Sequence, residues 1–278
     1  GSEMCIRDRN KVLELAENQS SLLSAAKFDQ NYNSQYSYIA KVGYPMGMMY
    51  GFIYEGTYKY EDFDKVGDTY TLKRNVPYFS SESNTQPGMP KYADLNGDGI
   101  IDDNDRTMIG NGMPKHTGGF TNNFEYKGFD LSIFFQWSYG NDVLNANRLF
   151  FENSNKTRDL NQYASYADRW TLENPESNIP RATDSGSNKV FSTRIIEDGS
   201  FLRLKTVSLG YTLPKQLTKK WKIDNARVFV AGQNLWTCTG YSGYDPEVSI
   251  REGALTPGLD FSAYPRAYSI SFGINLGF

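Results

Sequence analysis

Residues 268–278 read YSISFGINLGF, and this stretch decides the fold class. Serine, glycine and asparagine alternate with the apolar side chains Tyr268, Ile270, Phe272, Ile274, Leu276 and Phe278. Strict alternation predicts a β-strand with one apolar and one polar face. A tilted strand needs about 9–11 residues to cross a membrane, whereas strands of soluble sheets are most often about half as long. The stretch therefore predicts a strand of a transmembrane β-barrel.

A second stretch, FTNNFEYKGFDLSIFFQWSYG (120–140), repeats this pattern as a pair of strands. Apolar positions share one parity before Lys127-Gly128 and the other parity after it, which predicts a tight hairpin at that turn. Asp130 and Gln136 fall on the opposite, polar face. Aromatic residues at the strand ends suit the two interfaces of a membrane.

Three weaker strands are expected at 36–44, 200–213 and 225–236, which brings the total to about six. In 200–213, Leu202 and Leu204 are out of phase with Val207 and Leu209. A change of phase within a strand predicts a bulge, or a stretch that lies above the membrane.

The connections between these strands alternate in length. Lys127-Gly128 and 214–224 are short, whereas 45–116, 141–199 and 237–264 are long. Outer-membrane barrels have short periplasmic turns and long extracellular loops. We therefore expect the three long segments to be extracellular and the last strand to end in the periplasm.

Composition excludes several classes of function. The 278-residue chain has a net charge of −3, which gives no electrostatic footprint for nucleic acid. Cys5, Cys238 and His116, the only histidine, form no cluster with zinc-ligand spacing, and a catalytic triad would have to use a histidine in a Gly- and Pro-rich segment. No run of about 20 apolar residues predicts a spanning helix.

The first nine residues, GSEMCIRDR, fit no pattern found in the rest of the chain. We interpret 1–9 as a non-native start and assign 10–278 to the barrel segment. Because no export signal precedes this β-rich sequence, we expect the chain to be a fragment of a longer protein.

Residues 94–105, DLNGDGIIDDND, carry the one explicit chemical motif. Oxygen donors occupy positions one, three, five, nine and twelve of an EF-hand-type calcium loop, and Gly99 takes position six, where such a loop turns sharply. The predicted ligands are Asp94, Asn96, Asp98, the carbonyl of Ile100, Asp102 and Asp105. Calcium is the expected ion, with a structural role, because magnesium prefers to keep its waters. A solvated acidic turn is the alternative.

The sequence resembles the C-terminal third of SusC/RagA-type TonB-dependent outer-membrane transporters of the Bacteroidetes. The stretches that carry the resemblance keep the order and spacing of that family and cover nearly the whole chain after residue 10. They are GYPMGMMYGFIYEG (43–56), the segment 90–142 with the calcium-type loop, DRWTLENPESNIPRA (168–182), SFLRLKTVSLGYTLP (200–214), ARVFVAGQNLWTCTGYSGYDPE (226–247) and YPRAYSISFGINLGF (264–278). Cys238 departs from the pattern, because the family more often has Phe or Thr there.

The resemblance implies an all-β fold, the last six or so strands of a 22-stranded antiparallel barrel with long extracellular loops. It implies import of oligosaccharides or peptides across the outer membrane, with a SusD-like surface lipoprotein as partner. Energy would come from TonB-ExbB-ExbD through a plug domain that this sequence does not contain. It also implies that Phe278, the terminal aromatic residue, is the signal recognised by the barrel assembly machinery.

Several side chains are candidates for lining the transport path. Asp130, Gln136, Arg203 and Asn275 take inward, polar positions on their strands. In the outer loops, Trp170, Tyr241 and Tyr244 are expected to contact substrate or the lipoprotein partner, with packing inside the loops as the alternative for all three.

Two other classes of function stay open at this point. One is a secreted, calcium-stabilised carbohydrate-binding or adhesion module, although such a module would not leave the apolar face of 268–278 in water. The other is a glycoside hydrolase, which needs two carboxylates at a set separation across the bond. The clustered aspartates here have metal spacing instead, so no enzyme activity is expected.

Overall fold

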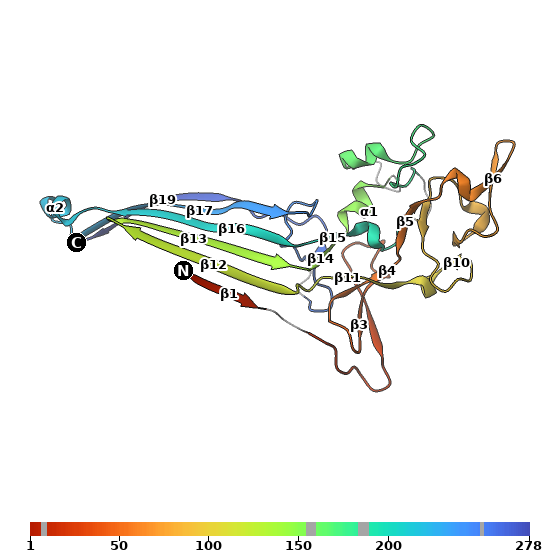
Figure 1. Cartoon of the computed structure of the whole chain (residues 1–278), viewed down its shortest axis with the longest axis horizontal. Helices are drawn as coiled ribbons and strands as arrows, with labels where there is room; N and C mark the ends of the chain where they lie inside the picture. Colours follow the sequence, from red (N-terminus) through yellow and green to blue (C-terminus); the bar gives the residue numbers. More distant parts are fainter. Residues whose placement is uncertain (7–9, 154–159, 183–188, 251–252) are drawn as a thin grey trace.

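The computed structural model describes residues 1–6, 10–153, 160–182, 189–250 and 253–278. A long, open β-sheet forms one end of the elongated molecule, and the long connections gather into a separate mass at the other end (Figure 1). We call that mass the loop body; it comprises the described residues of 10–115, 140–200 and 240–268. Over the described ranges, no helix combines the length and the apolar character needed to span a membrane.

The long sheet has six antiparallel strands in the order β1-β12-β13-β16-β17-β19. All of them except β1 come from the sequence-predicted set and run close to the predicted bounds. The strands are β1 (Ser2–Ile6), β12 (His116–Tyr126), β13 (Phe129–Tyr139), β16 (Phe201–Thr212), β17 (Asn225–Thr239) and β19 (Ser269–Gly277). The all-β prediction is confirmed.

A two-residue turn joins β12 to β13 as predicted. Lys127 has φ 47° and Gly128 has φ 87°, so both central residues are left-handed. That is the conformation of the hairpin turns that match the natural twist of paired strands. A Cβ at Gly128 would lie 2.8 Å from the carbonyl oxygen of Thr212, which explains glycine at this position.

The predicted bulge lies at Lys205 in β16. Phe134 pairs with Thr206 but Phe135 pairs with Leu204, so Lys205 is the extra residue. The shift returns Leu204 to the apolar face on the loop side of the bulge. On the other side, β17 accommodates the same irregularity with Asn234 at φ 52°.

One strand prediction is wrong in its location. The 36–44 segment does form a strand, β3 (Tyr36–Lys41), but β3 pairs within the loop body and not in the long sheet. Its place in the long sheet is taken by β1, which pairs with β12 from Ser2↔Thr121 to Ile6↔Thr117. Alternation alone could not reveal this, because it specifies a strand's faces and not its partner.

The loop body consists of small sheets. One has the order β11-β4-β3-β2, another β15-β14-β18, and the pairs are β8 with β10, β5 with β9 and β6 with β7. Their bounds are β2 (Ser21–Ala25), β4 (Met48–Gly51), β5 (Tyr54–Thr57), β6 (Phe63–Val66), β7 (Thr69–Leu72), β8 (Tyr78–Phe79), β9 (Pro90–Tyr92), β10 (Ile100–Ile101), β11 (Thr107–Asn111), β14 (Asp142–Asn145), β15 (Ile196–Asp198) and β18 (Leu259–Asp260).

Helices are short. The loop body contains α1 (Asn147–Phe151), and α2 (Lys215–Thr218) lies in the connection between β16 and β17. Among the described residues, 3₁₀ turns occur at Tyr60–Asp62, Glu82–Asn84, Asp103–Asp105, Ala164–Asp168, Thr193–Ile195 and Lys219–Trp221.

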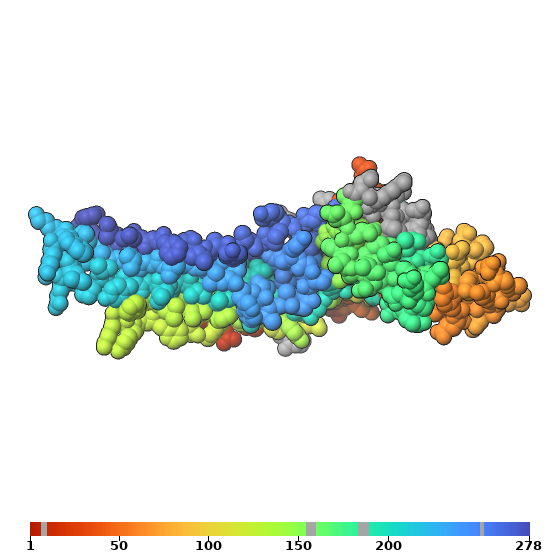
Figure 2. Space-filling view, turned by 90° about the horizontal axis from the view of Figure 1, so that it is seen from above, coloured from red at the N-terminus to blue at the C-terminus, as the bar shows by residue number. Residues whose placement is uncertain are grey.

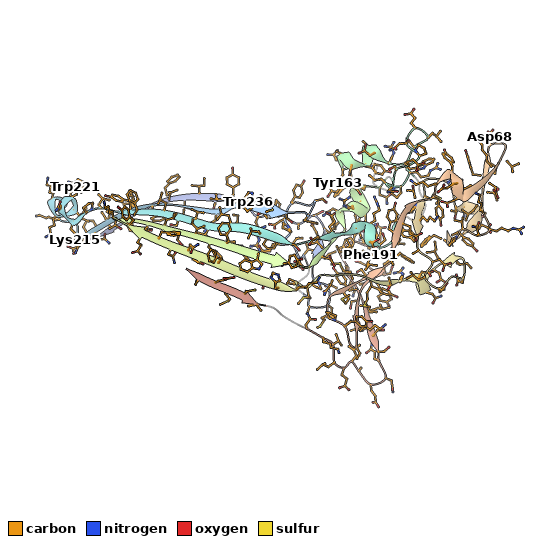
Figure 3. All side chains as sticks on the ribbon, viewed as in Figure 1. Asp68, Tyr163, Phe191, Lys215, Trp221 and Trp236 are labelled. Atoms are coloured by element: carbon orange, nitrogen blue, oxygen red, sulfur yellow. The ribbon has the colours of Figure 1, made fainter. Side chains whose placement is uncertain are left out.

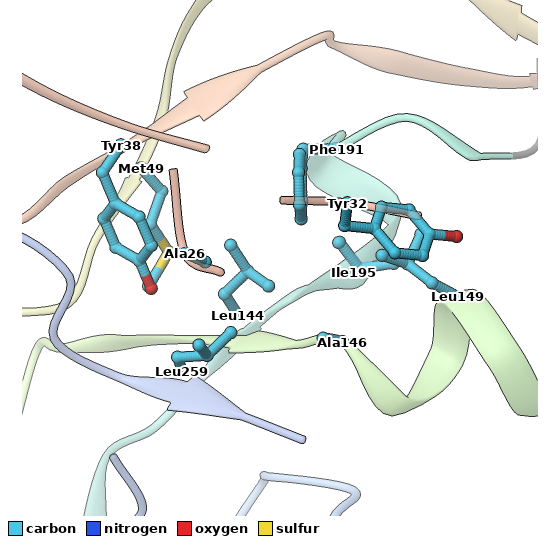
Figure 4. Close-up of a cluster of buried hydrophobic side chains, with 10 residues drawn as sticks. All are labelled: Ala26, Tyr32, Tyr38, Met49, Leu144, Ala146, Leu149, Phe191, Ile195 and Leu259. Atoms are coloured by element: carbon cyan, nitrogen blue, oxygen red, sulfur yellow. The ribbon is translucent and has the colours of Figure 1, made fainter. Parts of the chain in front are cut away.

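The hydrophobic core of the molecule lies in the loop body. Its largest cluster joins segments far apart in sequence around Leu144, with Tyr38 and Met49 on one side and Phe191 and Tyr32 on the other (Figure 4). Two smaller clusters centre on Phe52 and on Tyr58. None of the three buried clusters includes a residue of the six strands of the long sheet.

The ends of the long sheet differ as the sequence predicts. The Lys127-Gly128 turn, α2 and the C-terminus lie together at one end, and every long connection leaves from the other (Figure 1). Lys215 and Trp221 of the short connection lie at that first end, and Asp68 lies at the far tip of the loop body (Figure 3). The sheet thus carries the loop body on one end only.

Candidate functional site

One face of the long sheet is continuously apolar. Strand register places the apolar set of β13, β16, β17 and β19 side by side, with Phe129↔Tyr211, Leu209↔Val230 and Val230↔Phe272 among the pairs. Phe272 is 81% exposed and Ile274 is 68% exposed. A soluble protein rarely leaves so large an apolar surface in water. In the described chain, no buried cluster covers this face.

The opposite face of the same strands is polar. Asp130, Gln136, Arg203 and Asn275 share it, because Asp130 pairs with Gly210, Gln136 with Arg203, and Asn275 with Arg227. The inward, polar parity predicted for these four residues is therefore present as one surface. Seen from above, the strands that carry this surface form one long end of the molecule, and the loop body forms the other end (Figure 2).

An ion pair spans three strands on the polar face. The Arg227 guanidinium donates to both carboxylate oxygens of Asp130, at 2.9 Å from Nε and 2.5 Å from Nη2. Gly210 lies between them, and a Cβ there would come within 2.3 Å of Arg227 Nη2. The same guanidinium lies 5.2 Å from the centroid of the Phe229 ring. A bidentate pair fixes the position of both side chains.

A second arginine fastens the loop body to this face. Arg203 is 2% exposed and donates to Thr237 Oγ1, to Glu247 Oε2 at 2.9 Å and to Asp245 Oδ1 at 2.5 Å. Asp245 and Glu247 belong to the segment between β17 and β18. Burial alone would raise the pKa of Asp245, but hydrogen bonds from Arg203 and from the backbone N–H of Glu247 outweigh it and hold that pKa below its usual value.

A third charged cluster ties α1 to the segments around it. Arg148 donates to Glu197 Oε1 at 2.6 Å and to Glu152 Oε1 at 2.7 Å, and Arg194 donates to Glu152 Oε2 at 3.1 Å. Burial would raise the pKa of Glu197, yet its hydrogen bonds with Ser242 and Arg148 lower it overall. These pairs are structural, since each carboxylate is neutralised by an arginine.

The Asp-rich loop at 94–105 folds around its own carboxylates. Asp94 accepts hydrogen bonds from the backbone N–H groups of Gly97 and Gly99, at 2.7 and 2.8 Å. Asp105 is fully buried and accepts from Leu95 and Asp102, which closes the two ends of the loop. Gly99 has φ 83°, the left-handed turn expected at its position.

The backbone and the order of oxygen donors in this loop fit calcium, but the side chains are not gathered around one point. Among the described residues, no three His, Cys, Asp or Glu side chains converge as a metal cluster. Asn96 donates to Asp98 Oδ2 at 3.0 Å, and Asp98 Oδ1 accepts from the N–H of Ile100. Ion binding would therefore have to turn these oxygens inward.

The three aromatic residues predicted to contact substrate or partner lie in different environments. Trp170 is 5% exposed and packs against Gly88 and Tyr60. Tyr241 is 6% exposed and donates to Asp260 Oδ2 at 2.5 Å. Only Tyr244, at 83%, presents its ring to solvent. Trp170 and Tyr241 are thus largely buried within the loop body, and Tyr244 is open to solvent.

The remaining residues singled out in the sequence lie at or near the ends of strands of the long sheet. His116 is the first residue of β12, where Nδ1 accepts from Trp137 Nε1 at 3.2 Å and the ring stacks on Tyr139. Cys5 and Cys238 are free and exposed. Phe278 follows β19 and is 86% exposed. None of these contacts resembles a catalytic arrangement.

Sequence reasoning missed Arg227, Arg148 and Glu197. Arg227 lies between Ala226 and Val228 in β17, and this alternation indicates a position on the polar face. Its partner Asp130 lies 97 residues away, so the pair itself was not visible. Arg148 and Glu197 lie 49 residues apart in long segments without alternation, which carry no positional signal.

No model of a known protein family matches the chain. The TonB-dependent receptor P3 of Formosa agariphila is 32% identical over 98% of this chain and 26% of its own length. The TonB-dependent receptor SusC of Bacteroides thetaiotaomicron is 28% identical over 71% of the chain and 18% of its own length. The RagAB peptide transporter superposes with a TM-score of 0.70 at 24% identity, over 96% of the chain and 26% of the matched chain.

These relatives are receptors and transporters, not enzymes, and the fold matches the barrel portion of such proteins. The chain spans about a quarter or less of the length of the curated relatives it matches. By sequence and by fold, the chain belongs to the TonB-dependent receptors, the family that includes SusC.

Proposed function

We propose that this chain forms barrel wall and outer loops of an outer-membrane transporter that imports oligosaccharides or peptides. The observation that carries the proposal is the long sheet, with one exposed apolar face and one polar face. In a membrane, the apolar face would contact acyl chains, and closure with further strands would satisfy the open edges. The polar face, with the Asp130–Arg227 pair, would line a water-filled interior.

The asymmetry of the sheet supports an orientation. The short connections and the C-terminus would face the periplasm, and the loop body would face the outside, as in barrels of this membrane. The loop body is well placed to receive a surface lipoprotein of SusD type, which the RagAB and SusC relatives suggest as a partner. Import would draw its energy from TonB through a plug domain.

Growth measurements test the transport role. A strain that lacks the full-length gene is compared with its parent and with a complemented strain on a panel of oligosaccharides and peptides as sole carbon source. We expect a defect confined to one class of polymer, with no defect on the corresponding monomer. Equal growth on every polymer of the panel would contradict the proposal.

We further propose that residues 94–105 bind a structural calcium ion. Asp94, Asn96, Asp98, Asp102, Asp105 and the carbonyl of Ile100 supply hard oxygen donors in the order that calcium loops use. The loop leads into β11 and then β12, so an ion here would fix the path from the loop body into the sheet. Ile101, buried with Phe52 and Tyr92, anchors the other side of the loop.

Limited proteolysis of the full-length protein tests the ion. Chelation should speed cleavage between residues 90 and 112 in the parent protein, and Asp94→Ala or Asp98→Ala should make cleavage fast with and without calcium. Asp64→Ala, on an exposed strand of the same body, is the control and should keep calcium-dependent protection. Identical cleavage of the parent protein with calcium and with chelator would remove the claim.

Phe278 is proposed as the signal that the assembly machinery recognises on the last strand. Its ring is 86% exposed and makes no ring contact among the described residues, which leaves it accessible to another protein. Phe278→Ala should reduce the amount of folded barrel in the outer membrane, whereas Tyr264→Ala, comparably exposed in a loop, should not.

A further inference from the structure

A cavity of about 690 Å³ opens in the loop body between five short stretches of the chain, two of which are Tyr60 and Arg181–Ala182. One wall is the β6–β7 hairpin with Asp68 at its turn, the second is the segment around Gln86, and the third is the segment from Arg169 to Leu172. Asp68 marks the tip of the loop body farthest from the sheet (Figure 3). The cavity therefore lies near the tip of the loop body that would face the outside of the cell.

Aromatic rings form a row along this cavity. The Tyr70 and Tyr60 ring centroids are 5.2 Å apart, and those of Tyr60 and Trp170 are 5.7 Å apart. Both tyrosines are half-buried and so present part of each ring to the cavity. Rings of this kind pack on the apolar face of a sugar, and pockets for small ligands combine such surfaces with a few directed polar groups.

Two arginines supply hydrogen-bond donors to the cavity. Arg169 and Arg181 both line it, and neither pairs with a carboxylate among the described residues. Arg181 Nη1 donates to the carbonyl of Pro87 at 3.1 Å, and Arg169 Nη1 donates to the carbonyl of Tyr166 at 3.4 Å. Arg181 Nη1 also lies 3.4 Å from Gln86 Oε1. Because a guanidinium has five N–H groups, these contacts leave most donors of both arginines without an acceptor among the described residues.

Trp170 is the buried member of this aromatic row. Trp170 lines the cavity and is 5% exposed, and its indole Nε1 is buried without any hydrogen-bond partner in the described structure. Buried tryptophan N–H groups usually have an acceptor. Gly88, at φ 82°, leaves room for the indole, since a Cβ there would lie 2.3 Å from the ring.

We propose that this cavity binds a sugar unit that carries a carboxylate or a sulfate group. The guanidinium groups of Arg169 and Arg181 favour an anionic ligand with several acceptors, since guanidinium groups bind carboxylate and sulfate oxygens through paired N–H bonds. The rings of Tyr60 and Tyr70 favour a ligand ring with an apolar face. Asp68, exposed at the rim, would accept from sugar hydroxyl groups. The inference rests on the proposed function and names the class of its substrate.

Binding to the purified full-length transporter in detergent tests the inference without requiring transport. Titration calorimetry compares trigalacturonate, a sulfated galactan tetrasaccharide, uncharged maltotetraose and a tetraglutamate peptide. We expect one or both acidic saccharides to bind, and Arg169→Gln and Arg181→Gln to weaken that binding at least about tenfold, the worth of one charge-assisted hydrogen bond. Comparison of the carboxylated and sulfated probes identifies the anionic group.

Two controls keep the result interpretable. Arg74→Gln removes the same charge from an exposed position of the same body, outside the cavity lining, and should leave binding unchanged. Arg181→Lys should retain part of the affinity, because it keeps the charge but loses the paired donors. If Arg181→Gln does not fold, Arg169→Gln decides the test.

Three outcomes would overturn the inference. They are equal affinity for maltotetraose and the acidic saccharides, preference for the tetraglutamate peptide, and unchanged affinity in both arginine variants. Failure of the transport role would look different, because deletion of the gene would then leave growth on every polymer intact whatever the detergent titrations show.

Discussion

Arg203 links the loop body to the sheet through a buried set of polar contacts. Its guanidinium is buried and holds Asp245, Glu247 and Thr237, each from the strand or segment that follows β16. The sequence predicted an inward-facing Arg203 from strand parity. It could not predict the partners, since the 237–264 segment has no periodic pattern and its carboxylates could have pointed anywhere.

Arg203→Met should loosen the 240–266 segment. Removal of one partner from a buried ion pair leaves an uncompensated charge and costs about 3–5 kcal/mol. Hydrogen exchange on the full-length protein should show faster exchange in that segment. Arg266→Gln is the matched control, because Arg266 also contacts Glu247 but its side chain is 45% exposed, and such pairs are worth about 0–1 kcal/mol. Equal effects of the two changes would contradict this account.

The lowered pKa values of Glu197 and Asp245 predict acid sensitivity of the loop body. A carboxylate whose folded pKa lies below its ordinary value contributes stability above that ordinary value, 4.5 for Glu197 and 3.8 for Asp245, and loses it as the pH falls through the folded pKa. Asp142 acts in the opposite sense, because burial raises its pKa.

Thermal unfolding of the full-length protein measures this dependence. We expect a nearly constant melting temperature from pH 7 to about pH 5 and a decline below about pH 4. Glu197→Gln should lower the melting temperature at neutral pH and reduce the decline in acid. A melting temperature that rises as the pH falls below about 4 would show that the sign is wrong.

At the scale of elements, the strands of the long sheet follow from local pattern. β19 alternates without interruption and β13 does so except at Phe134, which is apolar on the polar face. The bounds of both strands and the hairpin turn at Lys127-Gly128 agree with the prediction. The 36–44 segment was assigned to the wrong sheet, because a short amphipathic strand fits any open edge. The identity of β1 was likewise invisible: Ser2–Ile6 occupies an edge that further strands would otherwise cover.

Deletion of Lys205 should disrupt β16 on one side of the bulge only. Without the extra residue, Leu202 and Leu204 would turn to the polar face and Arg203 to the apolar face, since a shift of one residue exchanges the faces of a strand. We expect loss of folded protein, seen as loss of the heat-modifiable band on a gel. Lys205→Ala keeps the bulge and should fold. Equal amounts of folded protein from the deletion and from Lys205→Ala would contradict the role of the bulge.

At the scale of the whole molecule, the chain divides into a loop body with its own buried core and a sheet without one. The three hydrophobic clusters account for the first part. The sheet leaves one apolar face exposed and two edges unpaired, which neither water nor lipid tolerates in isolation. The sequence predicted this division through its alternating and non-alternating segments, but not the folds of the small loop-body sheets.

Residues 10–278 expressed alone should not form a soluble monomer. The exposed face and the two edge strands should drive aggregation, and detergent should be needed to keep the protein in solution. Size-exclusion chromatography of the protein with and without detergent gives the answer. A cooperatively folded, monodisperse monomer in plain buffer would contradict the membrane assignment of the sheet.

The most direct test of the central claim compares two neighbouring residues of β19 that lie on opposite faces. The test uses the full-length transporter with its native cysteines, Cys238 included, replaced by serine. Ser271→Cys and Phe272→Cys are introduced separately and labelled in outer-membrane vesicles with a membrane-impermeant maleimide. We predict labelling of Ser271→Cys at least about tenfold faster than Phe272→Cys, because hydrocarbon suppresses the reactive thiolate. Equal labelling rates, or faster labelling of Phe272→Cys, would contradict the account.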